Sequence, residues 1–202
     1  MKKRLQITTR RTAKIFEQML AIRRVAYADD EFFRMDEFWE DLCADSDKWS
    51  IKRYRSDTVE DYKRKAGVIA FEDRVTLIAD ERLMENARRG CPFSNFILAH
   101  EAGHLGLDHH AKSGVIKNFQ LFAGPNGMSN LPPTVEELEA NYAAVFLQCG
   151  VALIDKRWEP MQLARRAYCE VRSVKKAQRL VQLEVFQREL NRPKPKSQRV
   201  IL

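Results

Sequence analysis

Residues 96–110 read FILAHEAGHLGLDHH and hold all four histidines of the 202-residue chain. Ser94 can cap a helix that begins just before this stretch, and the apolar content of the helix predicts that it is largely buried. Gly106 lies near its end, and we expect the helix to stop by His110. The sequence thus predicts a buried helix that carries every histidine of the chain.

His100, Glu101 and His104 form the pattern HExxH on this helix. Residues four apart share one face of a helix, so the two imidazoles can hold one metal ion while Glu101 reaches water beside it. Zinc (Zn2+) lowers the pKa of its bound water to about 7, and the carboxylate accepts the proton as the hydroxide attacks a carbonyl group. A histidine on an apolar helix is more often a hydrogen-bonded core residue, but the complete motif on a buried helix favours a metal site.

A catalytic zinc usually has three protein ligands, so the sequence should supply one more. His110 is the first candidate, because it lies ten residues after His100, which is the metzincin spacing. That motif requires glycine at position 107, where this chain has Leu107, and Gly106 comes one place early. The metzincin arrangement is therefore the least favoured of the alternatives.

Glu137 and Glu139 are the other candidates, and both lie on a second predicted buried helix that ends at Gly150. Thr134 can cap this helix, and the stretch 134–137 also matches a capping box, in which the Glu137 side chain bends back to the helix start. Glu139 would then be the third ligand, although two residues along a helix turn its side chain by about 200°. The residues alone leave both glutamates open.

His109 and His110 follow the motif at the end of the same helix. Imidazolium near a helix C-terminus interacts favourably with the dipole and the free carbonyls, and we favour this helix-ending role for both. The alternative role is a contact with a metal-binding side chain, or stabilisation of an oxyanion.

Apolar periodicity and turn residues predict the other elements. The region from residue 12 to residue 62 has charged and aromatic residues at helical spacing and predicts helices. Two β-prone runs, 68–71 and 75–78, flank a polar turn and predict a hairpin. The stretch 156–191 predicts two helices, divided near residues 171–173, with Ser173 capping the second.

Composition limits the class of protein. The net charge is +7 at pH 7, 45% of the residues are hydrophobic, and the four cysteines form no CxxC pair. The N-terminal residues lack the apolar run of a signal peptide, and the longest uncharged apolar run, 140–154, is too short to span a bilayer. We expect a cytoplasmic protein with reduced cysteines that does not enter a membrane.

The motifs HEAGH, residues 100–104, and ELEANYAA, residues 137–144, together with the hairpin before them, resemble the ImmA/IrrE family of metallopeptidases. The family pattern is HExxH followed by E-x-x-A-N-x-F-A, and its members are associated with cleavage of helix-turn-helix repressors. This chain departs from the pattern at Ala143, where the family has phenylalanine, and at residues 148–150, where Leu-Met-Pro is usual.

The resemblance implies that His100, His104 and Glu137 bind zinc and that Glu101 is the catalytic base. Asn141 lies one helical turn beyond Glu137 and is a further candidate for a contact within the site. The implied fold is α+β and dominated by helices, with a zincin-like core. The expected domains are a helical N-terminal region (1–66), a metallopeptidase core (67–155), C-terminal helices packed on the core (156–191) and a flexible basic tail (192–202).

We therefore expect a zinc-dependent endopeptidase whose substrate is a regulatory protein, such as a transcriptional repressor of the helix-turn-helix class. The first alternative is a metal-stabilised binding module that sequesters its partner without cutting it. A second alternative is nucleic-acid binding, because the stretch 162–183 resembles a helix-turn-helix and carries Lys175, Lys176 and Arg179.

Overall fold

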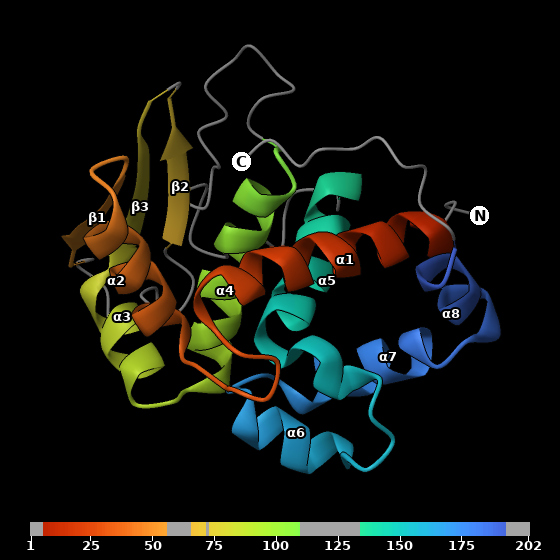
Figure 1. The fold of residues 1–202 in the computed structure, drawn as a ribbon. Coiled ribbons are helices and arrows are strands. Elements are labelled where there is room, and N and C mark those ends of the chain that lie inside the picture. Colours follow the sequence, from red (N-terminus) through yellow and green to blue (C-terminus); the bar gives the residue numbers. More distant parts are fainter. Residues whose placement is uncertain (1–5, 56–65, 72, 110–133, 193–202) are drawn as a thin grey trace, which may run out of the picture.

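The computed structural model describes residues 6–55, 66–71, 73–109 and 134–192 (Figure 1). These residues form an α+β fold in which helices dominate, as the sequence predicts. His110, the loop to residue 133 and the tail from residue 193 lie outside the described residues. The elements in chain order are α1(Thr9–Ala26), α2(Met35–Asp45), β1(Trp49–Tyr54), β2(Ala66–Ala70), β3(Val75–Asp80), α3(Glu81–Arg88), α4(Pro92–Gly106), α5(Val135–Cys149), the 3-10 helix η3(Gly150–Leu153), α6(Pro160–Arg166), α7(Val171–Val181) and α8(Glu184–Leu190).

The sheet has the strand order β1-β3-β2. The predicted hairpin is confirmed, because β2 pairs antiparallel with β3 in a register that sets Val68 opposite Leu77. The expectation of a wholly helical N-terminal region is wrong for residues 49–54, which form β1 and pair parallel with β3. β1 has an exposed side and carries two basic residues, so its sequence lacks the apolar character of a buried strand.

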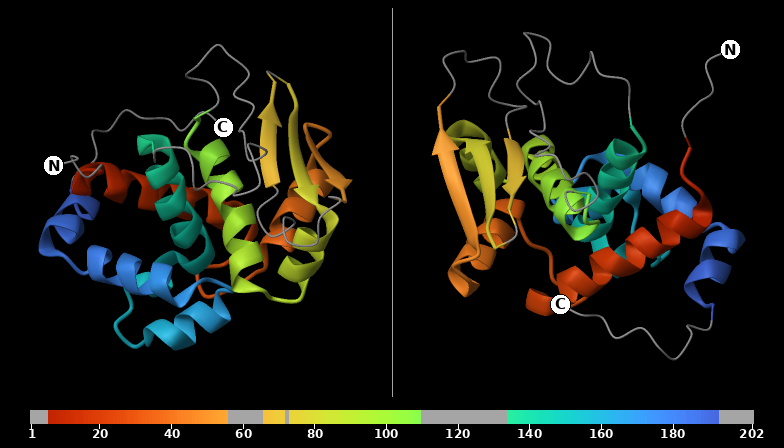
Figure 2. Two further views of the ribbon diagram at one scale, coloured as in Figure 1. Left: turned by 180° about the vertical axis from the view of Figure 1, so that it is seen from behind. Right: turned by 90° about the horizontal axis from the view of Figure 1, so that it is seen from above.

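Helices α2, α3 and α4 contact the sheet, and α4 lies next to its edge strand β2. Seen from behind, α4 and α5 run side by side between the sheet and the C-terminal helices (Figure 2). α1 crosses both helices and contributes Phe16, whose ring makes edge-to-face contacts with Phe146 at 5.0 Å and with Phe186 at 5.9 Å. Such aromatic pairs stabilise the fold beyond what the buried area alone contributes. These contacts join α1, α5 and α8 into one core.

α4 begins earlier than the sequence predicts. Pro92 occupies its first turn and Cys91 precedes it, so Ser94 is a buried residue inside the helix and not its cap. Proline suits this position because its missing N–H would have no partner within the helix. The Asn95 side chain then fixes the helix start by accepting from the Met35 N–H at 2.7 Å and donating to a carbonyl oxygen of α3 at 2.9 Å.

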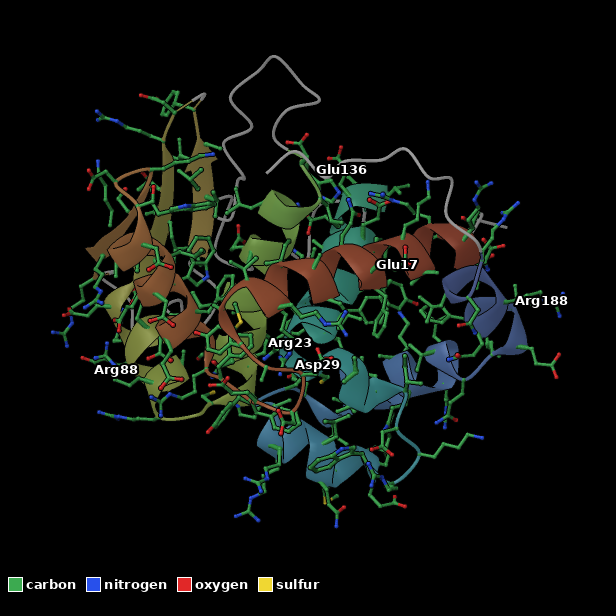
Figure 3. All side chains as sticks on the ribbon, viewed as in Figure 1. Glu17, Arg23, Asp29, Arg88, Glu136 and Arg188 are labelled. Carbon is green, nitrogen blue, oxygen red and sulfur yellow. The ribbon has the colours of Figure 1, made fainter. Side chains whose placement is uncertain are left out.

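α5 begins and ends where the sequence predicts. The Thr134 hydroxyl accepts from the Glu137 N–H at 3.2 Å, and Gly150 follows the helix with a φ of 53°. Arg23, which is fully buried and labelled in Figure 3, donates to the carbonyls of Leu147 at 2.9 Å and Gln148 at 3.1 Å. This guanidinium therefore satisfies the last carbonyls of the helix, which have no partner within it.

The C-terminal region differs in detail from the expectation. It forms three helices instead of two, and the first break lies at residues 167–170. Ser173 is therefore inside α7, which begins at Val171 after Glu170, and it is not a cap. Within the described residues, no helix combines the length and the apolar character needed to cross a membrane.

Candidate metal centre

The candidate centre lies between α4 and α5, which pack against each other. His100 and His104 occupy successive turns of α4, and Glu137 comes from the first turn of α5. A Cβ atom on Gly103 would come within 2.8 Å of the Ala143 Cβ, so the missing side chain is what lets the helices approach. The small residues of the two motifs therefore bring their polar residues together.

Three side chains present ligand atoms to a common point. The Nε2 atoms of His100 and His104 lie 3.0 Å apart, and the Glu137 carboxylate oxygens lie 3.1 Å from the first and 3.4 Å from the second. A tetrahedral zinc ion with Zn–N bonds of about 2.0–2.1 Å would set two nitrogen ligands about 3.3 Å apart. The three residues can therefore hold a divalent metal ion.

The protonation states in this group suit metal binding. Hydrogen bonds from both histidines hold the pKa of Glu137 well below its usual range, so the carboxylate is ionised. Burial lowers the pKa of His104 to about 4, which keeps its imidazole neutral. Burial also acts on His100, but the carboxylates of Glu137 and Glu101 outweigh it and raise its pKa. Metal ligands must be deprotonated, so the states of Glu137 and His104 favour metal binding, whereas the raised pKa of His100 works against it.

Glu101 is the buried acid of the motif and is only 2% exposed. Its Oε2 atom has no hydrogen-bond partner in the described parts of the chain. Burial raises its pKa to about 7, against the opposing effect of His100. A buried carboxylate oxygen without a partner is costly, and a water molecule on a neighbouring metal ion would satisfy it. Its burial and raised pKa make Glu101 a candidate for a general base.

Asn141 forms a hydrogen bond with His100, the first histidine of the motif. Its Oδ1 atom lies 3.2 Å from Nδ1 of His100, on the far side of the ring from the Nε2 that faces Glu137. A metal-binding histidine commonly donates its other ring N–H in this way, which fixes its orientation. Asn141 thus contacts His100, a candidate metal ligand. A contact within the site was the role expected for this residue.

His109 does not have the helix-ending role that we favoured from sequence. Its side chain is only 1% exposed, and its Nδ1 atom lies 2.9 Å from Nδ1 of His104. The backbone after α4 adopts a φ of 57° at Asp108, and the next residue turns back toward the helix. The structure agrees with the alternative role, because His109 contacts His104, one of the candidate metal-binding side chains.

Glu139 points away from the group of three ligand atoms. Its carboxylate lies 3.1 Å from Nε2 of His109 and accepts from the Arg11 guanidinium, with an Nε distance of 2.7 Å. The sequence gives no signal for Arg11, because this contact joins residues 128 positions apart. Between the two glutamates left open by the sequence, the structure brings Glu137 to the histidines of the motif.

No protein-family model, curated protein or solved structure matches the chain. Fold and site therefore define it only as a class: an α+β protein with a candidate His-His-Glu metal centre between two adjacent helices.

Proposed function

We propose that this protein is a zinc-dependent endopeptidase of the ImmA/IrrE type. The observation that carries the proposal is the position of Glu137. It stands in the second of two sequence motifs, and its carboxylate lies within 3.4 Å of both histidines of the first motif. Glu101, the acid of that first motif, is buried beside them with an oxygen that lacks a partner in the described residues.

The reaction follows from what these side chains do. A bound zinc ion would supply Lewis-acid chemistry, lowering the pKa of a water molecule and polarising the carbonyl of the scissile bond. Glu101 would accept the proton of the attacking water on a carboxylate oxygen and would pass it to the amine nitrogen as the peptide C–N bond breaks. In the metal-free site, burial raises the pKa of Glu101 to about 7, which favours its taking up a proton.

The sheet provides a place for the substrate backbone. β2 is an edge strand, and it lies beside α4. An extended peptide that pairs with this edge would run past the two histidines of α4, in the manner of an added strand. A substrate of this kind must offer an extended segment, and the resemblance to ImmA/IrrE peptidases favours a helix-turn-helix repressor.

Glu101→Gln tests the peptidase directly. Zinc-loaded parent and variant are incubated with a proteome-derived peptide library and with helix-turn-helix repressors, and new N-termini are counted by mass spectrometry. We expect cleavage by the parent and a loss of about 10²–10⁴-fold in the variant, with zinc retained. Equal cleavage by both would overturn the role of Glu101. A zinc-loaded parent without cleavage would overturn the peptidase and favour the metal-stabilised binding module.

A second candidate function, binding to a nucleic-acid backbone, is favoured by the exposed face of α7. This helix contains no acidic residue, and its basic residues recur at the spacing of one helix face. They are Arg172, Lys175, Lys176 and Arg179, all exposed. α6 and α7 are joined by a connection of four residues, 167–170, as in a helix-turn-helix.

Salt dependence tests this second candidate. Binding of duplex DNA that uses the face should weaken steeply with salt, with a slope in log K against log[salt] of about −0.9 for each phosphate contacted. Neutralising Lys175, Lys176 and Arg179 together should abolish it, whereas Arg188→Gln on α8 is the control. Binding that the triple change leaves intact would exclude this face.

A further inference from the structure

A continuous line of hydrogen bonds leads from the candidate metal centre to α1. His104 contacts His109 at 2.9 Å, His109 contacts Glu139 at 3.1 Å, and Glu139 accepts from Arg11 at 2.7 Å. The two histidines and Glu139 are buried, and Arg11 lies at the edge of the interior. Three side chains from three segments of the chain thus line up behind one histidine of the candidate metal centre, His104.

The chemistry of imidazole fixes the direction of this line. A neutral imidazole has one N–H donor and one bare acceptor nitrogen. With Nε2 of His104 committed to the metal centre, its proton sits on Nδ1 and points at His109. Nδ1 of His109 must then be the bare acceptor, which places the His109 proton on Nε2. That N–H donates to Glu139, whose ionised carboxylate can only accept.

Glu139 and Arg11 keep the proton of His109 on its Nε2 atom. If His109 carried its proton on Nδ1, two N–H groups would face each other across 2.9 Å. An ionised carboxylate next to Nε2 excludes this tautomer, because it requires a donor there. The Arg11 guanidinium holds that carboxylate with two nitrogens, each of which donates to one of its oxygens. Behind His100, Asn141 needs no further residue to fix its role, because its amide oxygen can only accept the N–H of the His100 Nδ1 atom.

We propose that His109, Glu139 and Arg11 are positioning residues of the metal centre, which set the tautomer and ring orientation of His104 and thereby raise its affinity for the metal ion. The inference rests on the metal site of the proposed function but not on peptide cleavage. His104 would be oriented through a histidine, whereas His100 is oriented directly by an amide. Outer contacts of this kind typically change metal affinity by about 10–100-fold.

Zinc affinity, measured by competition with a chelator, tests the inference in the full-length protein. We expect His109→Leu, Glu139→Gln and Arg11→Met each to weaken zinc binding, the first by about 10–100-fold. Glu136→Gln and Arg10→Met, on the same helices as Glu139 and Arg11, are matched controls that should bind zinc as the parent does. Circular dichroism of the metal-free variants establishes that each is folded.

His109→Asn provides a rescue that a merely structural role would not give. The Asn Oδ1 atom takes nearly the same place as Nδ1 of histidine and is always an acceptor. We expect this variant to keep an affinity within about threefold of the parent and to make Glu139→Gln harmless when the two are combined, because coupled residues give non-additive effects. The visible spectrum of the Co²⁺-loaded variants should shift with His109→Leu and not with His109→Asn.

The outcomes separate the two proposals. Parent-like zinc affinity in folded His109→Leu and Glu139→Gln would overturn the positioning role and leave the metal site standing. Equal losses for Glu139→Gln in the parent and in the His109→Asn background would also overturn it, because Glu139 would then act without His109. A parent that binds no zinc would overturn the metal site itself.

Discussion

Gly103 of α4 lies directly against Ala143 of α5. A Cβ atom on Gly103 would come within 2.8 Å of the Ala143 Cβ and 3.1 Å of the Ala140 carbonyl oxygen. The backbone oxygen cannot move without shifting α5, so an added methyl group must push the helices apart. The first turn of α5 carries Glu137, and α4 carries the two histidines. The distance between the helices therefore sets the geometry of the candidate metal centre.

Gly103→Ala should destabilise the protein and weaken zinc binding together. Overpacking of this kind typically costs about 1–3 kcal/mol, and the separation of Glu137 from the histidines should reduce zinc affinity. Chemical denaturation and chelator competition measure the two effects. Gly106→Ala is the matched control, because its Cβ would meet only the flexible ends of Ile22 and Met19. Unchanged zinc affinity in Gly103→Ala would refute the claim that the distance between α4 and α5 sets the geometry of the metal centre.

Arg23→Lys should lower the free energy of unfolding by about 2–4 kcal/mol. The buried guanidinium donates to the carbonyls of Leu147, Gln148 and Glu31, and an ammonium group lacks the fork that reaches all three. Denaturant titration measures the loss. Arg24→Lys, at a side chain 53% exposed and paired with Asp29, should change stability by less than about 0.5 kcal/mol. Equal effects of the two changes would contradict the capping role of Arg23.

The buried carboxyl of Asp36 should make the stability of the folded protein depend on pH. Its carboxyl is 1% exposed, and burial raises its pKa above 3.8 despite Arg34 and Arg88 nearby. A folded-state pKa above the unfolded value means that the folded state binds the proton more tightly. Stability from this group is therefore fully present below the unfolded pKa and is lost as the pH rises through the folded pKa.

Asp36→Asn removes that loss. Relative to the parent, the variant should gain stability as the pH rises from about 4 to about 7, because asparagine cannot ionise. Thermal unfolding of both proteins across this range gives the comparison. Asp73→Asn, at a side chain 81% exposed, is the control and should follow the parent. A variant that loses stability relative to the parent with rising pH would have the wrong sign for this explanation.

Zinc should stabilise the folded protein in a concentration-dependent way. A ligand that binds only the folded state adds about 2.7 kcal/mol when its free concentration is 100 times the dissociation constant. Calorimetry with and without a chelator should show a melting temperature that rises with zinc in the parent. The rise should vanish in Glu137→Ala, and persistence of the full effect there would place the bound zinc elsewhere.

The sequence is sufficient for features that depend on local pattern. The hairpin and the limits of α5 at Thr134 and Gly150 follow from β-propensity and from helix capping, and both act within a few residues. A third ligand further along the chain than HExxH was also expected, because a catalytic zinc usually has three protein ligands. The choice of Glu137 over Glu139 came from the family resemblance and not from the residues themselves.

Features that depend on distant contacts were not predictable. β1 pairs Ser50 with Thr76, a residue 26 positions away, and the alternation of Trp49 and Ile51 with polar residues is its only local strand signal. Arg11 reaches Glu139 across 128 positions, and no local pattern records such a pair. His109 was assigned to the helix end because dipole effects are local, whereas its buried position includes a contact with Glu139, which lies 30 positions further along the chain.

The most direct test of the metal centre is the zinc content per chain by elemental analysis. We would load the parent, Glu137→Ala and Glu139→Ala with excess zinc, remove the free metal and measure all three in parallel. The three-ligand site predicts about one zinc ion per chain in the parent and in Glu139→Ala, and little or none in Glu137→Ala. A parent without zinc, or a Glu137→Ala variant that keeps its zinc, would contradict the metal centre and the peptidase built on it.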